Sequence, residues 1–282
     1  FIIVAFLYVL AVSFGRSLFF IRKDRINILI YDRTPFILSL GQDDNVHYMT
    51  DYLADWKVEV PGGYGPYRVG AVRKLTDLEK KPDILTRTFS YSSSLFIDYI
   101  FYPRNVDIYF GKEGDRPHLP TVYDLFFTKT NASFFDTLYL SLTIASKRPQ
   151  EITLLESNDA VKRIQGDEVF DPNVFAKKYQ GFFYSKRIRD ENKSVQILYT
   201  KSDLTAYQIA RTIEGNGIRI SDITQLEYSK KGCIVSEKDR AHSYTAVSLA
   251  EFFHCSMENS STGIYDIIFT LGEKEKEWEV GR

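Results

Sequence analysis

The first 15 residues form the segment that most restricts how this chain can fold. Phe1 to Gly15 reads FIIVAFLYVLAVSFG and contains no charged residue. Such a stretch is typical of a helix surrounded by lipid, although a bilayer span needs about 20 apolar residues. The next residues, Ser17 to Ile21, are again mostly apolar, and the chain does not begin with Met. We therefore expect a transmembrane anchor over residues 1–21, truncated at its upstream end.

An apolar N-terminal segment can also be a cleaved signal peptide or a buried core helix. No small-residue cleavage pattern precedes the charges at Arg22, Lys23 and Arg25, which disfavours a signal peptide. A core helix usually has some polar face, which this segment lacks. The three basic residues favour a cytoplasmic location for that end of the span, so the sequence leaves the orientation open.

Length and composition indicate an anchor followed by two modest domains. The chain has 282 residues, of which 44% are hydrophobic and 26% charged, and this is enough apolar material for real cores. Lys and Arg number 36 against 37 Asp and Glu, giving a net charge of -1. There is thus no electrostatic reason to expect nucleic acid as a partner.

Residues 26–190 have the pattern of a mixed α/β domain. Apolar β-rich runs predict strands at 26–31, 36–40, 58–60 and 97–102, and helical periodicity covers 69–95. A Gly-rich and Pro-rich turn at 61–66 matches no phosphate-binding motif and is best explained as a tight turn. The polar segment 156–173 suits a long surface connection.

Residues 194–282 predict a smaller domain of two layers. Strands are expected at 194–199, 218–226, 232–236 and 265–271, with helices at 202–214 and 243–254. Gly215-Asn216-Gly217 is a typical helix end. The resulting order β-α-β-β-α-β makes a ferredoxin-like layout an expectation.

This last stretch resembles the LytR C-terminal domain. The matching segments are VQILY, DLTAYQIARTIEGNG, CIVS, YTAVSLAEFFHC and YDIIFTLGE, in that order. That domain commonly follows a LytR-CpsA-Psr domain, and INILIYDR, FILSL and LADWKVEVPGGYGPYRVGAV are similar to parts of the latter. The resemblance implies a bacterial cell-envelope protein. Family enzymes transfer a glycopolymer from polyprenyl pyrophosphate, using arginines and an Asp to hold the pyrophosphate and its metal.

The sequence departs from that family at the positions that the resemblance implies for pyrophosphate binding. Ala54 stands where a pyrophosphate-binding Arg is expected, and only Asp55 of that motif is kept. The loop between the first two strands is shortened to about 32–34, and the Arg-rich run expected later has no counterpart. We therefore predict a non-catalytic protein. If a clamp for pyrophosphate exists, the candidates are Asp55, Arg68, Arg73 and Arg87.

Histidines and cysteines add no catalytic or metal motif. The four histidines are scattered and none has HxxxH or HExxH spacing, so no metal site is predicted. Cys233 begins a predicted strand and Cys255 ends the following helix. A disulfide in an oxidising compartment and two separate thiols in a reducing one both remain open.

Three functions follow, in order of preference. The first is a non-catalytic cell-envelope protein, anchored in the cell membrane by its N-terminal helix, that binds a cell-wall polymer, a lipid-linked precursor or a partner protein. The second is a glycopolymer transferase that acts on polyprenyl pyrophosphate. The third is a structural subunit of a pilus or secretion apparatus, on architecture alone. No cofactor is expected, except Mg²⁺ for the transferase, and the family resemblance places the soluble part outside the cytoplasm.

Overall fold

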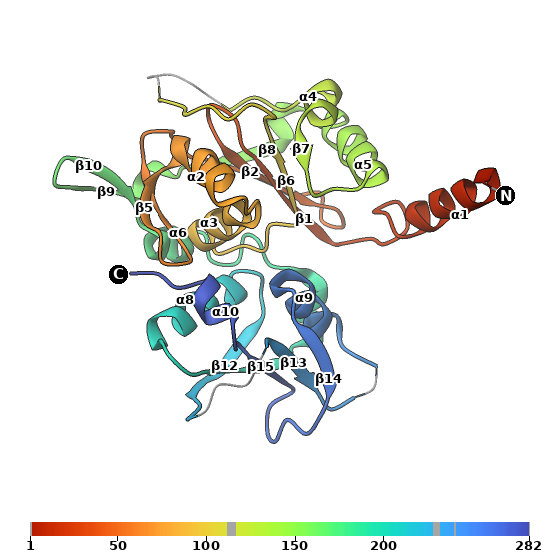
Figure 1. The fold of residues 1–282 in the computed structure, drawn as a ribbon, viewed down its shortest axis with the longest axis vertical. Coiled ribbons are helices and arrows are strands. Elements are labelled where there is room, and N and C mark those ends of the chain that lie inside the picture. The colour runs from red at the N-terminus through yellow and green to blue at the C-terminus, as the bar shows by residue number, and fades with distance from the viewer. Residues whose placement is uncertain (1, 112–116, 228–231, 240, 282) are drawn as a thin grey trace.

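The computed structural model describes residues 2–111, 117–227, 232–239 and 241–281, with side chains from residue 8 onward. Its strands form three sheets with helices packed on them, which confirms the predicted mixed α/β class (Figure 1). A six-stranded and a four-stranded sheet are built from the first part of the chain, up to Phe170. A five-stranded sheet is built from the last part, which begins at Ser194.

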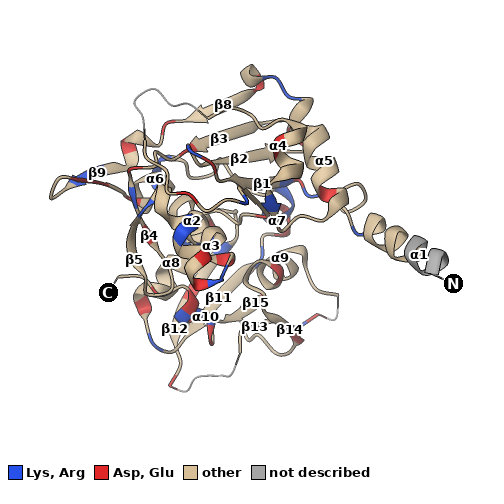
Figure 2. Ribbon diagram, turned by 45° about the horizontal axis from the view of Figure 1, so that its top comes forward, with Lys and Arg blue, Asp and Glu red and all other residues tan. Residues whose placement is uncertain are grey.

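The N-terminal segment forms a helix that is shorter than predicted. Helix α1 (Ile2–Gly15) carries no charged residue and projects from the body of the protein (Figures 1 and 2). The chain then turns, because the Ser17 N–H and hydroxyl both donate to the carbonyl of Phe14 (3.0 and 2.6 Å). Leu18 is buried, and its N–H donates to Asp136. The prediction that residues 17–21 extend a span is therefore wrong. Among the described residues, no helix is both long and apolar enough to cross a membrane.

The six-stranded sheet is covered on both faces. Its order is β7-β6-β1-β2-β3-β8. The strands are β1 (Arg25–Ile30), β2 (Phe36–Gly41), β3 (His47–Asp51), β6 (Tyr99–Tyr102), β7 (Lys129–Thr130) and β8 (Ile152–Leu155). β1 and β2 pair antiparallel, as expected of two apolar runs joined by a short turn, and every residue of both is buried. Burial on both faces requires two layers of covering helices.

Alternate residues of these strands contribute to two different hydrophobic cores, because successive side chains point to opposite faces. Leu29 and Ile37 pack in one core, and Ile28 and Leu38 pack in the other. The helices on the first face are α2 (Val72–Glu79), α3 (Asp83–Ser93) and α6 (Pro172–Lys178), and those on the second are α4 (Val122–Phe127) and α5 (Phe134–Ala145).

The four-stranded sheet contains a hairpin that the sequence did not predict. Its order is β5-β4-β10-β9, with β4 (Lys57–Val60), β5 (Gly65–Arg68), β9 (Val161–Ile164) and β10 (Asp167–Phe170). The predicted surface connection at 156–173 is thus wrong over most of its length. Gln165 and Gly166 both have positive φ (52° and 91°), which suits the tight turn of a two-residue hairpin.

The five-stranded sheet contains every strand and helix predicted for the last part, in a different arrangement. Its strands are β11 (Ser194–Tyr199), β12 (Arg219–Gln225), β13 (Ile234–Glu237), β14 (Ser256–Asn259) and β15 (Ile267–Thr270), and its helices are α8 (Asp203–Glu214), α9 (Tyr244–Phe253) and α10 (Lys274–Glu277). The order is β12-β11-β15-β13-β14. Each of α8 and α9 joins two neighbouring parallel strands. The ferredoxin-like prediction is wrong, because that layout places another strand between the two that a helix joins.

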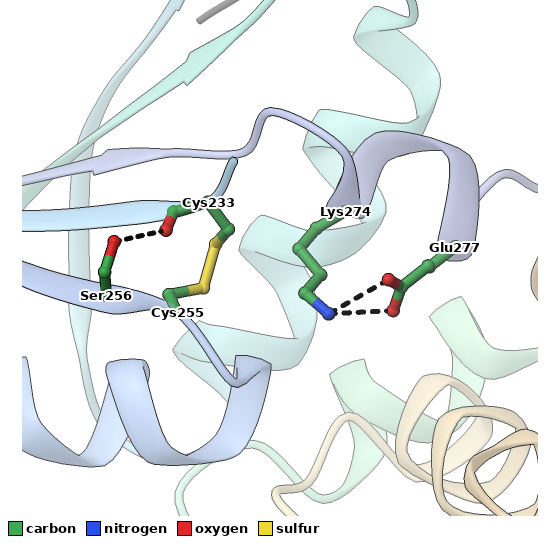
Figure 3. Close-up of a disulfide and its surroundings, with 5 residues drawn as sticks. All are labelled: Cys233, Cys255, Ser256, Lys274 and Glu277. Carbon is green, nitrogen blue, oxygen red and sulfur yellow. Dashed lines mark hydrogen bonds and ion pairs between the residues drawn. A yellow bond between two sulfur atoms is a disulfide. The ribbon is translucent and has the colours of Figure 1, made fainter. Parts of the chain in front are cut away.

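A disulfide joins Cys233 and Cys255 at one end of this sheet (Figure 3). Their Cα atoms are 4.8 Å apart. The register explains why they meet, since β13 and β14 pair in parallel with Ile234 opposite Ser256, and each cysteine directly precedes its strand. The Ser256 hydroxyl also donates to the carbonyl of Cys233 (3.2 Å).

The first and last parts are joined by close contacts at the end of α8. Asn216 accepts the N–H of Phe96 at its side-chain oxygen (3.0 Å), and its carbonyl accepts the N–H of Ser185. Helix α7 (Lys186–Glu191) adds a second link, since the Glu191 carboxylate accepts the N–H groups of Tyr244 and Thr245 (both 2.8 Å) at the start of α9. These contacts fix the orientation of the two parts.

One carboxylate at the start of the last sheet gives a prediction for pH dependence. Asp266 accepts the N–H and the hydroxyl of Ser194 (2.8 and 2.7 Å), and these bonds lower its pKa. A depressed pKa stabilises the fold above the unfolded value of about 4, and this contribution is lost as the pH falls through the folded value. In urea unfolding we expect the stability difference between wild type and Asp266→Asn to shrink as the pH is lowered from 7 to below 4. A difference that is constant over this range would contradict the assignment.

Candidate functional site

The best candidate for a ligand site lies where two parallel strands end. β1 and β6 pair in parallel, with Ile30 opposite Phe101, so their carboxyl ends meet at one edge of the sheet. Ligands of open α/β sheets bind in the crevice outside such strand ends. A groove of about 660 Å³ opens there, lined by the segments that follow both strands and by α4. We call it the strand-end groove.

Two arginines supply positive charge to the strand-end groove. Arg33 follows β1 and Arg104 follows β6, and both are exposed lining residues. Neither forms an ion pair with another residue that the structure describes. Asp32 and Asp107 line the same groove. Charged groups of both signs therefore converge from chain segments far apart in the sequence.

The charged groups near the strand-end groove affect the pKa of the Tyr109 hydroxyl. Burial raises the pKa of Tyr109, and the carboxylates of Asp32 and Asp107 raise it further. The guanidinium groups of Arg33 and Arg73 act in the opposite direction on the same pKa. All four charged groups thus lie within electrostatic range of one phenol, which remains protonated at neutral pH.

The strand-end groove also contains a third carboxylate, Asp124, and its large apolar side chains are mostly aromatic. Its lining includes Tyr31, Phe36, Phe101, Tyr123 and Phe127. The rings of Tyr123 and Phe127 stack with centroids 4.1 Å apart on α4. An apolar groove with a few convergent charged groups is the common form of a small-molecule site. This one fits an elongated apolar ligand with an anionic end.

Arg73, one of the candidates from the sequence, lies behind the wall of the strand-end groove. The Tyr31 hydroxyl donates to the carbonyl of Val69 (2.7 Å) and accepts the N–H of Arg73 (3.2 Å). The Arg73 guanidinium lies 4.9 Å from the ring centroid of Tyr102 and 3.6 Å from the carboxylate of Asp77, and the residue is only 3% exposed. Arg73 therefore holds Tyr31 and the end of β6 in place.

Asp55 and Arg68 support the outer wall of the groove instead of lining it. They form an ion pair with each other (Nη2 to Oδ1, 3.0 Å). Asp55 also accepts the N–H of Gly111 (3.1 Å), and Arg68 lies 4.5 Å from the ring centroid of Phe110. This pair fixes the segment that carries Tyr109. Its role is positioning.

Buried packing explains the alanine at the position where the family resemblance implies an Arg. Ala54 is fully buried, and its carbonyl accepts the N–H of Gly70 (2.9 Å). The carbonyl of Gly70 in turn accepts the N–H of Tyr109 (3.0 Å). A larger side chain at residue 54 would separate these backbone segments, and the groove wall would move with them.

Arg87, the fourth candidate, lies in a different cavity. This cavity, of about 450 Å³, lies between the first part of the chain and helices α9 and α10. Arg87 pairs with Asp83 (3.0 Å) and donates to the carbonyl of Glu277. Lys23 in the same cavity pairs with Asp98 (2.6 Å). Arg87 and Lys23 therefore already have carboxylate partners, whereas Arg22 and Arg187 line the same cavity without an ion pair to another described residue.

The residues that line the strand-end groove were largely missed from the sequence. Arg33 belongs to the shortened loop, and the sequence predicted no role for Arg104 or Asp107. The sequence signal that could have identified these residues is a charged residue shortly after each of two predicted apolar strands. Within the described residues, no group of three or more His, Cys, Asp or Glu side chains is close enough together to hold a metal ion.

The sequence matches no known family model and no curated protein. Solved structures with some likeness include TagU and TagV of B. subtilis, at 11% and 12% identity and a TM-score of 0.39 each. The alignments cover 57% and 54% of this chain, and 96% and 92% of those chains. A third is the LytR-CPS2A-psr family protein YwtF (TagT) with bound octaprenyl pyrophosphate lipid, at 12% identity and TM-score 0.38, covering 56% of this chain and 90% of that one.

Proposed function

We propose that the protein is a cell-envelope protein that binds a lipid with a pyrophosphate head and an apolar chain in the strand-end groove. The observation that carries this proposal is the pair Arg33 and Arg104, which form no ion pair with another described residue and line a groove with aromatic side chains. Arginine binds phosphate oxygens strongly through two parallel hydrogen bonds. The aromatic walls supply the apolar contact that a prenyl chain needs. Sequence segments that resemble the LytR-CpsA-Psr family agree with this ligand class.

In the first form of this proposal the protein binds the lipid and does not catalyse a reaction on it. The supports are the arrangement of Asp55, Arg68 and Arg73, which hold the groove wall, and the place of Arg87 in the other cavity. None of these side chains is presented to a ligand in the strand-end groove as a catalytic clamp would require. In this form the ligand needs no metal or cofactor, and the bound lipid or the polymer that it carries is the partner.

The binding test uses farnesyl pyrophosphate as a soluble probe in isothermal titration calorimetry. We expect Arg33→Ala and Arg104→Ala each to weaken binding by about tenfold, because each removes a charge-assisted hydrogen bond. The matched control is Arg163→Ala, which removes an exposed arginine of the β9–β10 hairpin that pairs with Glu168 (3.3 Å), and this variant should bind as wild type does. Equal weakening in the control, or farnesol binding as tightly as the pyrophosphate, would contradict the proposal.

A second form of the proposal is a transferase, and one observation favours it. Asp32 and Asp107 line the same groove as the two arginines, so the groove holds carboxylates that could orient an attacking hydroxyl next to a bound pyrophosphate. The measurement is release of prenyl phosphate with Mg²⁺ present, as a hydroxyl of an added glycan acceptor bonds to the polymer-side phosphorus of a lipid-linked glycopolymer and the pyrophosphate P–O–P bond breaks. Release that is abolished by Asp32→Asn, with probe binding retained, would establish catalysis. No release above the buffer rate would leave binding as the function.

We further propose that the soluble part functions outside the cytoplasm. The support is the disulfide between Cys233 and Cys255, because such bonds persist in oxidising compartments. Alkylation of thiols in intact cells, before and after reduction, tests this location. Free thiols in the native protein would contradict it.

A further inference from the structure

The cavity between the two parts of the chain contains polar groups that the proposed function does not use. We call it the junction cavity. Helices α9 and α10 lie on the side of the last part that faces the first, and residues of both parts line this cavity (Figure 1). Ser185 and Asn216 are among them, and the hydrogen bonds of these two residues fix the orientation of the two parts. The cavity therefore has a fixed shape, and its volume of about 450 Å³ is that of a small-molecule site.

Two buried side chains in the wall of the junction cavity each have a polar atom without a partner. Asn27 is 4% exposed and Arg87 is 7% exposed. The Nδ2 group of Asn27 donates to the carbonyl of Phe96 (2.9 Å), and its Oδ1 atom accepts no hydrogen bond from the part of the chain that the structure describes. Arg87 directs Nη1 to Glu277 and Nη2 to Asp83, and its Nε–H has no acceptor among the described residues. A buried acceptor and a buried donor without partners are costly, so their place in one cavity wall indicates a polar occupant.

Two arginines give the junction cavity positive charge. Arg22 precedes β1 and Arg187 belongs to α7, and both are exposed lining residues that form no ion pair with another described residue. The Arg187 guanidinium lies 4.2 Å from the ring centroid of Tyr244, which holds it beside the start of α9. The other lysines and arginines of the lining already pair with carboxylates, and these are Lys23, Arg25, Arg87 and Lys274. Arg22 and Arg187 are thus the groups that can bind an anion, since arginine forms two parallel hydrogen bonds to phosphate or carboxylate oxygens.

Helix α9 contributes a face that suits a ligand with hydroxyl groups. Tyr244, Ser248, Glu251 and Phe252 line the cavity, and their spacing of three or four residues places them on one side of the helix. Glu251 is exposed and forms no ion pair with another described residue, so its carboxylate can accept hydrogen bonds from hydroxyls. The half-buried ring of Phe252 stacks on that of Phe96 (4.2 Å between centroids) and supplies an apolar surface. A carboxylate repels a simple anion, but it binds the hydroxyls of an anion that carries them.

We propose that the junction cavity binds a small anion rich in hydroxyls, a sugar that carries a phosphate or a carboxylate group. Arg22 and Arg187 bind the anionic group, and Glu251 accepts hydrogen bonds from the hydroxyls. Asn27 and Arg87 form a polar inner wall with one acceptor and one donor still to be paired. This proposal does not depend on the proposed function, because the junction cavity and the strand-end groove lie at opposite ends of β1 and share no lining residue.

Isothermal titration calorimetry of the full chain with four probes tests this site. The probes are glucose 6-phosphate, glucuronate, glucose and inorganic phosphate. We expect one or both of the sugar anions to bind, and the tighter of the two identifies the anionic group. Glucose and inorganic phosphate should each bind at least about tenfold more weakly, because each lacks one of the two kinds of contact.

Substitution of the two arginines locates the binding. Arg22→Ala and Arg187→Ala should each weaken binding of the sugar anion by about tenfold, because each removes a charge-assisted hydrogen bond. The matched control is Arg189→Ala, which removes an exposed arginine of α7 that lies 5.4 Å from the ring centroid of Tyr184 and does not line the cavity. This variant should bind as wild type does.

Four results would overturn the proposal. If none of the probes bound, water alone would occupy the junction cavity. Inorganic phosphate binding as tightly as the sugar anions would show that hydroxyls are not recognised, and equal weakening by Arg189→Ala would show unspecific attraction to a basic surface. Excess farnesyl pyrophosphate should leave binding of the sugar anion unchanged, since no residue lines both sites. Displacement would place the sugar anion in the strand-end groove.

Discussion

Replacing Gly215 with alanine is expected to lower the free energy of unfolding by about 2 to 4 kcal/mol, as overpacking at a site with no room to relax does. A Cβ atom at Gly215 would lie 1.8 Å from the carbonyl oxygen of Ser94. That oxygen belongs to the backbone, so no flexible side chain can yield. Gly215 has φ of -60°, which alanine adopts freely, and the entire effect would come from this collision. Urea denaturation at neutral pH measures it.

Gly15→Ala provides the matched control. A Cβ atom at Gly15 would meet no atom within 4 Å, and its φ is outside the positive range. The same substitution should therefore be neutral or slightly stabilising there. If Gly215→Ala unfolded at the same urea concentration as wild type, the ends of α3 and α8 would have to be further apart than their packing indicates.

Gly215 also shows what sequence reasoning reaches and where it stops. The Gly215-Asn216-Gly217 run correctly predicts the end of a helix, because glycine and asparagine tolerate the conformations that follow one. Its second role depends on Ser94, which is distant in the sequence. Periodicity and end signals are local and carry no information about which distant segment the turn will contact.

In the last sheet too, the sequence predicted the local elements but not their pairing. The helices predicted at 202–214 and 243–254 and the strands predicted from apolar patterns are present, with Ser202 and Ser243 as the N-caps of α8 and α9. The order of strands was wrong because β15 pairs with both β11 and β13 at the centre, and no residue pattern states which neighbours a strand will choose. The short, mostly exposed strand β14 gave no apolar signal.

The strand-end groove was harder to predict because its parts are separated in the chain. Arg33 and Arg104 line one groove only because β1 and β6 pair in parallel. The family motif pointed to Asp55, which pairs with Arg68 behind the segment that lines the groove. The prediction that residues 17–21 extend a membrane span failed for another reason. A short apolar run has the same composition whether it spans lipid or turns and buries Leu18.

Loss of the Cys233–Cys255 disulfide is expected to lower the free energy of unfolding by about 3 kcal/mol, because the bond closes a loop of 22 residues and restricts the unfolded chain. The Cys233→Ser and Cys255→Ser double variant should show this loss in urea denaturation under oxidising conditions. The native sheet should persist in the variant, since Ile234 and Ser256 still pair through their backbones. Circular dichroism before unfolding checks that persistence.

The two single variants separate the effect of the bond from that of the side chains. A disulfide needs both sulfur atoms, so each single variant should lose as much stability as the double variant, and the three losses should not add. Wild type treated with reductant should then unfold at the same urea concentration as the double variant. Losses that add, or a wild type that does not respond to reductant, would mean that the two cysteines stabilise this end of the sheet as separate small apolar side chains, and the support for an oxidising compartment would be lost with the bond.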